Sequence, residues 1–170
     1  LTAEQQAGSG ALAYLLIKAG YGWVALLVAA GIWAYSPGRI ETKLFFLSGV
    51  SIFSTTLTLG TYGGRELAIS GDVLAFLMSL NHLAVLQVSA SLVALFWVYP
   101  IRQSRFPGHY VILAIGVLAW LSDQFQLATS PQYTVYSVIV VGFILGVMVL
   151  GRQWRLTRNH PIERASLKWC

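Results

Sequence analysis

Apolar residues fill five long stretches of the chain, at about residues 12–35, 44–62, 73–99, 110–127 and 133–150. Each stretch approaches the roughly 20 residues that a helix needs to cross a bilayer, where no backbone polar group can be left unpaired. Proline or glycine, which interrupts a helix, borders every stretch, as at Ser36-Pro37-Gly38 and Pro100. The pattern predicts an all-α, polytopic membrane protein, a single domain over residues 1–170 built as a bundle of about five transmembrane helices.

The basic residues lie almost entirely in alternate loops, which predicts an orientation. Nine Lys and Arg residues fall in loops 39–43 and 102–109 and in the segment after Leu150, against one, Arg65, on the opposite side; Lys18 lies inside the first stretch. By the positive-inside rule, the N-terminus lies outside and the C-terminus is cytoplasmic. Residues 151–170 then form a cytoplasmic basic flank, with Arg152, Arg155, Arg158, Arg164 and Lys168.

Composition agrees with a membrane protein, since 56% of residues are hydrophobic and only 10% are charged. The net charge of +5 does not indicate a nucleic-acid partner, because five of the eleven basic residues lie beside a membrane stretch. The single cysteine, Cys170, excludes an internal disulfide. The chain begins without Met and ends on returning apolar residues, so we expect a piece of a longer protein.

Polar residues inside a membrane are costly and therefore mark candidate sites. Asn81, His82 and Gln87 lie in the third stretch, with the first two roughly 14 Å from its outer end. Asn81 and His82 point in different directions, and His82 and Gln87 share a face only loosely. We predict polar contacts within the membrane for all three. A histidine here serves as a ligand, a proton carrier or a pH switch, or, more commonly, as an interhelical hydrogen-bonding residue.

Three further patterns concern helix pairing. Lys18 and Asp123 both lie toward the outer leaflet, so an ion pair between them is geometrically feasible, as is snorkelling of Lys18 to the surface. Gly142 and Gly146 form a GxxxG pattern that predicts a tight helix contact, within the chain or between copies. The hydroxyl residues between Ser48 and Thr58 favour close packing over a polar ligand pocket.

Enzyme and cofactor signatures are absent from the sequence. It has no glycine-rich phosphate loop, no zinc-ligand spacing and no nucleophile with a base at a readable distance. A haem between helices typically needs two axial histidines, but His109 and His160 both lie on the cytoplasmic side. We therefore expect no catalytic residue, no metal and no cofactor.

Three short motifs are spread along the chain. The first is a proline-bearing turn before a Phe-rich stretch, and the second is an aromatic-proline-basic turn after the third stretch. The third is a basic loop that closes on Leu-x-Trp. In order, they read Trp33-Ala34-Tyr35-Ser36-Pro37 with Lys43-Leu44-Phe45-Phe46-Leu47-Ser48-Gly49, Phe96-Trp97-Val98-Tyr99-Pro100-Ile101-Arg102, and Pro161-Ile162-Glu163-Arg164 with Leu167-Lys168-Trp169. These motifs resemble the membrane region of bacterial sensor histidine kinases of the competence-quorum type, which are often followed by a GAF domain.

The resemblance implies a sensory input module in the bacterial cytoplasmic membrane, in which a stimulus alters helix packing and the exit helix informs a kinase. The chain departs from those kinases because it has no nucleotide-binding domain, and His160 is followed by Pro161 rather than a phospho-acceptor pattern. The alternative is an accessory subunit of a respiratory or photosynthetic membrane complex. An intramembrane enzyme using His82 or Asp123 is less favoured than either a sensory module or an accessory subunit of a membrane complex. Expected partners are the bilayer and either other subunits or a second copy, with no nucleic acid.

Overall fold

The computed structural model describes residues 3–63, 69–103, 106–127, 131–159 and 161–162. These residues form five α-helices and one short 3₁₀-helix: α1 (Ala3–Tyr35), α2 (Ile40–Gly63), α3 (Gly71–Val98), α4 (Gly108–Gln124), α5 (Pro131–Leu156) and η1 (Thr157–Asn159). No strand occurs over these ranges, so the all-α prediction is confirmed.

Within the described residues, four helices are long and apolar enough to cross a membrane. The candidate spans are Leu16–Tyr35, Ile40–Thr61, Gly71–Val98 and Val135–Asn159. Helix α4 has 17 residues, or about 26 Å of length, slightly less than a hydrocarbon core of about 30 Å. Large apolar side chains such as Phe143, Leu118 and Leu27 lie exposed on the helix surfaces. The length and exposed apolar surface of these helices are those of a membrane protein.

Two helix ends differ from the predicted stretches. Helix α4 ends at Gln124 rather than Leu127, because Gln126 takes the left-handed conformation with φ 49°. Helix α5 continues past Leu150 to Leu156, so the first part of the basic flank is helical. Helix α5 continues through this polar segment because the Gln153 side chain is buried in the bundle, whereas Arg152 and Arg155 stay exposed.

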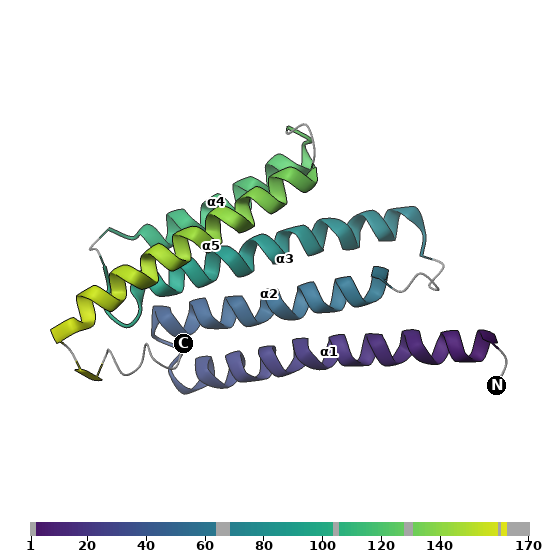
Figure 1. Ribbon diagram of the computed structural model, residues 1–170, viewed down its shortest axis with the longest axis horizontal. Coiled ribbons are helices and arrows are strands. Elements are labelled where there is room, and N and C mark those ends of the chain that lie inside the picture. The colour runs from purple at the N-terminus through teal and green to yellow at the C-terminus, as the bar shows by residue number, and fades with distance from the viewer. Residues whose placement is uncertain (1–2, 64–68, 104–105, 128–130, 160, 163–170) are drawn as a thin grey trace.

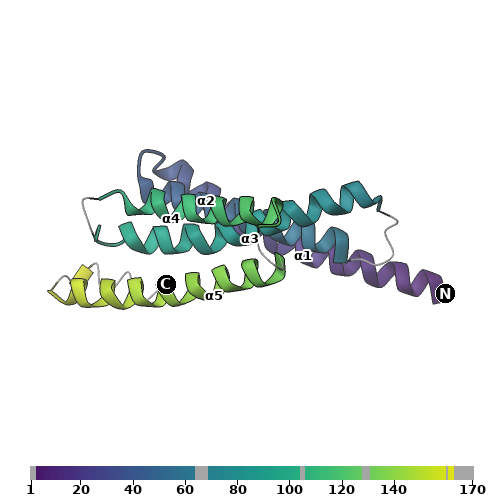
Figure 2. The same ribbon diagram turned by 90° about the horizontal axis from the view of Figure 1, so that it is seen from above.

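Helices α1, α2 and α3 lie in a row, and α4 and α5 pack on α3 on the side away from α1 (Figure 1). The view from above separates α4 and α5, which overlap in the first view (Figure 2). Helix α3 thus contacts three helices, α2, α4 and α5. We call the end where α3 begins the Gly71 end, and the opposite end, where α3 is followed by Arg102, the Arg102 end.

Close packing joins the row of helices. A Cβ added to Gly22 would lie 2.1 Å from the Thr56 hydroxyl, and one added to Gly49 would lie 2.4 Å from the Ala29 Cβ, so α1 and α2 approach through glycine. Toward the Arg102 end, Leu44 packs with Ala94 and Val98 of α3 in a buried cluster. These contacts hold α3 in place, and α3 carries the polar residues of the candidate site.

Candidate functional site

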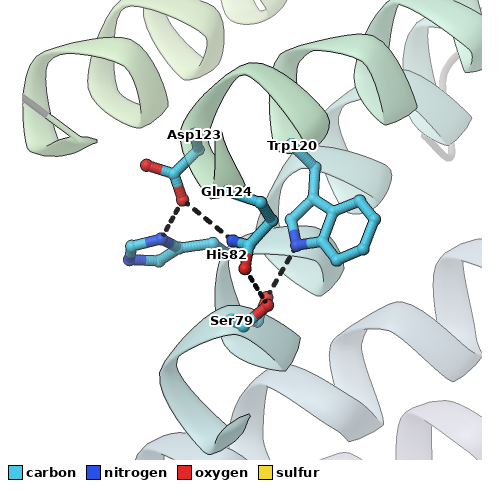
Figure 3. A network of polar contacts seen from close by, with 5 residues as sticks. All are labelled: Ser79, His82, Trp120, Asp123 and Gln124. Atoms are coloured by element: carbon cyan, nitrogen blue, oxygen red, sulfur yellow. Dashed lines mark hydrogen bonds and ion pairs between the residues drawn. The ribbon is translucent and has the colours of Figure 1, made fainter. Parts of the chain in front are cut away.

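An acid–base pair joins α3 to α4 near the Gly71 end (Figure 3). The Nδ1 atom of His82 lies 2.7 Å from Oδ2 of Asp123, and the two side chains are 23% and 3% exposed respectively. When the carboxylate is ionised it only accepts hydrogen bonds, and the hydrogen of this contact then belongs to Nδ1. The other ring nitrogen, Nε2, then accepts a hydrogen bond when the ring is neutral and donates one when the ring is protonated.

Three neighbouring residues extend the pair into a network (Figure 3). Nε2 of Gln124 donates to Asp123 Oδ2 at 3.4 Å, and the Ser79 hydroxyl donates to Gln124 Oε1 at 2.8 Å. The indole Nε1 of Trp120 donates to the Ser79 backbone carbonyl at 3.1 Å. Sequence reasoning missed these three residues. Their spacing could have indicated two of them, because Trp120 and Gln124 lie four positions apart and therefore share one face of α4.

The end of α4 fixes the position of Asp123. Leu127 N donates to the Ser122 carbonyl at 3.0 Å and Gln126 N to the Asp123 carbonyl at 3.1 Å, the two bonds of a Schellman motif. Asp123 therefore sits in the last turn, where the helix dipole presents partial negative charge and disfavours a carboxylate. The His82 contact offsets this cost. The second carboxylate oxygen, Oδ1, is buried with no hydrogen-bond partner among the described residues.

Asn81 and Gln87, the other two polar residues predicted on α3, lie apart from the His82–Asp123 pair. Asn81 faces α2, where the fully buried Thr58 hydroxyl lies 3.1 Å from its Oδ1. Gln87 faces α4, because a Cβ added to Gly116 would lie 3.2 Å from its Nε2. The structure thus separates the three residues of α3: His82 and Gln87 meet α4 at different depths, and Asn81 meets α2.

An ion pair between Lys18 and Asp123 stays a prediction. The hydrogen bonds described for the Asp123 side chain run to His82 and Gln124. Lys18 lies on α1, which packs against α2. The structure gives Asp123 a partner on α3, His82, at 2.7 Å.

The two glycines of the GxxxG pattern face α3. A Cβ added to Gly142 would lie 2.0 Å from the Ser89 hydroxyl, whereas one added to Gly146 would meet only Val93, at 3.8 Å. Gly142 thus permits the close approach of α5 to α3, and Gly146 leaves space beside it. The contact lies within one chain.

The hydroxyls of α2 are mostly satisfied by their own helix. Ser48, Ser51, Ser54 and Thr56 donate to backbone carbonyls three or four positions earlier. Thr55 differs, because its buried hydroxyl has no partner among the described residues. The hydroxyl face therefore serves packing in most places and leaves one donor unused.

A second polar contact, which sequence reasoning missed, lies at the Arg102 end. Nε2 of the fully buried Gln153, on α5, donates to the backbone carbonyls of Phe96 at 2.8 Å and Ile101 at 2.5 Å. Gln103 returns a bond from its Nε2 to the Val149 carbonyl at 3.1 Å. The Phe96 carbonyl lies in the last turn of α3 and the Ile101 carbonyl just after that helix, so neither has a partner within the helix. Gln153 satisfies them and binds α5 to α3.

His109 lies toward the same end of the bundle, at the start of α4 and just before the predicted stretch 110–127. Its side chain is buried, its Nδ1 has no partner among the described residues, and its ring centroid lies 4.2 Å from that of Tyr110. Burial, and after it the charge of Arg102, lowers the pKa of His109 below its usual 6.5. The neutral ring is therefore favoured in the folded protein.

The basic flank is only partly described. Arg152, Arg155 and Arg158 are exposed at the Arg102 end, on α5 and η1. Arg164 and Lys168 lie outside the described residues, as does His160. Arg152 precedes Gln153, and Arg155 and Arg158 follow it within two turns. The buried contact and the basic surface therefore belong to one helix end.

The chemistry available at the site is hydrogen bonding and proton exchange. No group of three or more His, Cys, Asp and Glu residues that could hold a metal ion occurs in the part of the chain that the structure describes. A single histidine held by a carboxylate is suited to binding a polar group or exchanging a proton. Comparison with protein-family models, curated proteins and solved structures gives no match to this chain.

Proposed function

We propose that this chain is the sensory input region of a bacterial signal-transduction protein in the cytoplasmic membrane, with five spans, the N-terminus outside and the C-terminus inside. The observation that carries the proposal is that α3 is held by polar contacts near both ends. His82 binds Asp123 of α4 at one end, and the last carbonyls of α3 bind Gln153 of α5 at the other. A stimulus at the first contact then has a mechanical route to the second.

The Gly71 end is the receiving part in this proposal. The His82–Asp123 contact is incompletely satisfied, because Oδ1 of Asp123 lacks a hydrogen-bond partner among the described residues. In the proposal, α3 and α4 pack in two alternative arrangements. A ligand or a proton that binds the pair shifts the equilibrium between them by as much as it binds one arrangement more tightly than the other. Rearrangement of this contact displaces α3 relative to its neighbours.

The Arg102 end is the transmitting part. Gln153 bonds to α3 from inside α5, and the exposed Arg152 and Arg155 flank it on the same helix. Movement of α3 therefore reaches the basic exit segment through the hydrogen bonds from Gln153 to Phe96, in the last turn of α3, and to Ile101, just after that helix. The positive-inside rule places that segment on the cytoplasmic side, where a kinase would receive it.

Phosphate incorporation by the natively purified protein tests the proposal. The full-length gene product and its stoichiometric partners are incubated with labelled ATP, as wild type, His82→Ala, Asp123→Asn and the control Val117→Ala, which alters an exposed residue of α4. We expect labelling of the protein or a partner, changed severalfold by the first two variants and unchanged by the third. Stoichiometric co-migration with haem or pigment proteins without labelling contradicts the sensor role and favours the accessory subunit.

The orientation is tested separately by cysteine accessibility. Cys170 is the one cysteine of the sequence, so a Cys170→Ser background accepts single cysteines at Gln126, by the Gly71 end, and at Arg155, by the Arg102 end. A membrane-impermeant maleimide should label Gln126→Cys in intact cells and Arg155→Cys only after permeabilisation. The reverse labelling would exclude the proposed orientation, and labelling of both from outside would show that α5 does not cross the membrane.

A further inference from the structure

A lateral groove runs along α3 between α2 and α5. Its volume is about 590 Å³, it is open along one side, and apolar side chains such as Leu92, Phe96 and Val147 form most of its walls. The residues that α3 contributes extend from Val85 to Phe96, a length of about 17 Å. Volumes of roughly 300 to 1,000 Å³ suit small-molecule ligands. Because both flanking helices are candidate spans, the groove opens toward lipid.

The polar groups of the groove gather at its Gly71 end. Val85 and Ser89 line it and follow His82 by three and seven positions, so the three residues share one face of α3. Thr55 lines the same end, since it lies one turn from Thr58, which meets Asn81. The groove is thus polar at one end and apolar along the rest.

Two buried polar atoms have unused hydrogen-bonding capacity. One is at Thr55, in the groove lining, and the other is at Asp123, whose partner His82 lies one turn beyond Val85 and outside the lining. Oδ1 of Asp123, on a side chain 3% exposed, and the Thr55 hydroxyl have no partner among the described residues. The partly exposed His82 ring also makes no described hydrogen bond through Nε2. A carboxylate oxygen and a neutral imidazole nitrogen are acceptors, so they complement a ligand that donates O–H groups.

We infer that the groove binds a single-chain neutral lipid, with its hydrocarbon tail along the apolar walls and a hydroxyl head group at the His82–Asp123 pair. The choice of this ligand class rests on the proposed function, in which the pair receives the stimulus. The binding assay itself does not depend on signalling. The unused acceptors of the pair match a hydroxyl head group, which donates a hydrogen. The phosphate of a phospholipid head is itself an acceptor, so it does not complement a carboxylate oxygen.

Binding of monoolein to the purified full chain tests the inference. Methyl oleate is the matched probe, because it has the same tail and lacks hydroxyl groups. Native mass spectrometry from detergent should show one monoolein per chain, bound about tenfold more tightly than methyl oleate, as expected for hydrogen bonds that include a charged group. His82→Ala should remove this preference and leave methyl oleate binding unchanged. Equal affinity of the wild type for both probes would overturn the assignment of the head-group site.

Variants of α5 test the groove itself. Gly146→Leu places a side chain in the groove, where an added Cβ meets nothing nearer than 3.8 Å. Gly151→Leu is the matched control, because it has no neighbour within 4 Å and lies outside the groove. We expect the first to weaken both probes at least tenfold and the second to weaken neither.

Leu92→Trp, at a residue of α3 that lines the groove, provides a second obstruction in case Gly146→Leu fails to fold. It should also weaken both probes. Wild-type affinity in both obstructing variants would overturn the groove assignment. A chain that binds neither probe and forms a dimer broken by Gly146→Leu would show that a second copy occupies the groove, which also overturns the inference. Loss of signalling with lipid binding intact would instead count against the proposed function alone.

Discussion

The two ends of α3 are held by different chemistry. Near the Gly71 end, His82 and Asp123 form a titratable pair with one unpartnered carboxylate oxygen. At the Arg102 end, a neutral and fully buried amide, that of Gln153, binds two backbone carbonyls. The amide contact contains no ionisable group, whereas the acid–base pair contains two and keeps an acceptor that a ligand could fill. In the proposed function, the first end is the one that responds and the second is the one that transmits.

Removal of the amide should cause the largest loss of stability. Gln153→Leu leaves the carbonyls of Phe96 and Ile101 buried without donors, so we expect the free energy of unfolding to fall by about 3 kcal/mol. Unfolding in detergent, followed by circular dichroism, measures the change. Arg152→Leu, at an exposed neighbour on α5, should change it by less than about 0.5 kcal/mol. Equal losses in the two variants would show that the amide does not anchor α5.

The acid–base pair should contribute less. A double-mutant cycle of His82→Ala and Asp123→Ala should give a coupling energy of about 1 kcal/mol, because side-chain hydrogen bonds between membrane helices are modest. The matched cycle of Asn81→Ala and Asp123→Ala should be additive, since Asn81 faces α2. Coupling in the second cycle, or none in the first, would remove the distinction between the two faces of α3.

A backbone change at the Gly71 end should raise the free energy of unfolding. The gain should be similar to, or smaller than, the coupling energy of the His82–Asp123 pair. Gln126 takes φ 49°, a conformation that glycine adopts without penalty. Gln126→Gly should therefore raise the free energy of unfolding by up to about 1 kcal/mol while keeping the Schellman motif that places Asp123. Gln126→Ala should give no gain, because alanine retains the Cβ. A gain from alanine as well would mean that the glutamine side chain, and not its backbone, carries the cost.

Helix number and class could be predicted from sequence because hydrophobic length is read directly from the chain. The helix ends were less accessible. Helix α5 continues to Leu156 because Gln153 finds two carbonyls in the bundle, and α4 stops early because Gln126 turns left-handed. Both depend on contacts or dihedrals that residue type does not specify.

The candidate site was predictable in its members and not in its pairing. His82 and Asp123 each stood out as polar residues in apolar stretches, yet pairing them requires the relative rotation and depth of α3 and α4. Sequence position offered only Lys18 as a partner of Asp123, because both lie toward one leaflet, and left snorkelling of Lys18 as an equal alternative. Gln153 was missed for a related reason, since a glutamine among arginines in a basic segment looks like part of a solvated surface until its burial is known.

The smallest effect expected is a pH dependence at the Arg102 end, which tests how far that end is insensitive to protonation. Burial and the Arg102 charge lower the pKa of His109 below 6.5, so just below that pH the unfolded chain binds more protons than the folded one. Stability should therefore rise with pH through this window, be complete above about 6.5, and be lost as the pH falls through the lowered pKa. Unfolding of His82→Ala, measured from about pH 5 to about pH 8, isolates His109, because it removes the other described histidine. Addition of His109→Gln should flatten the remaining slope, and a slope that persists would place the titrating group elsewhere.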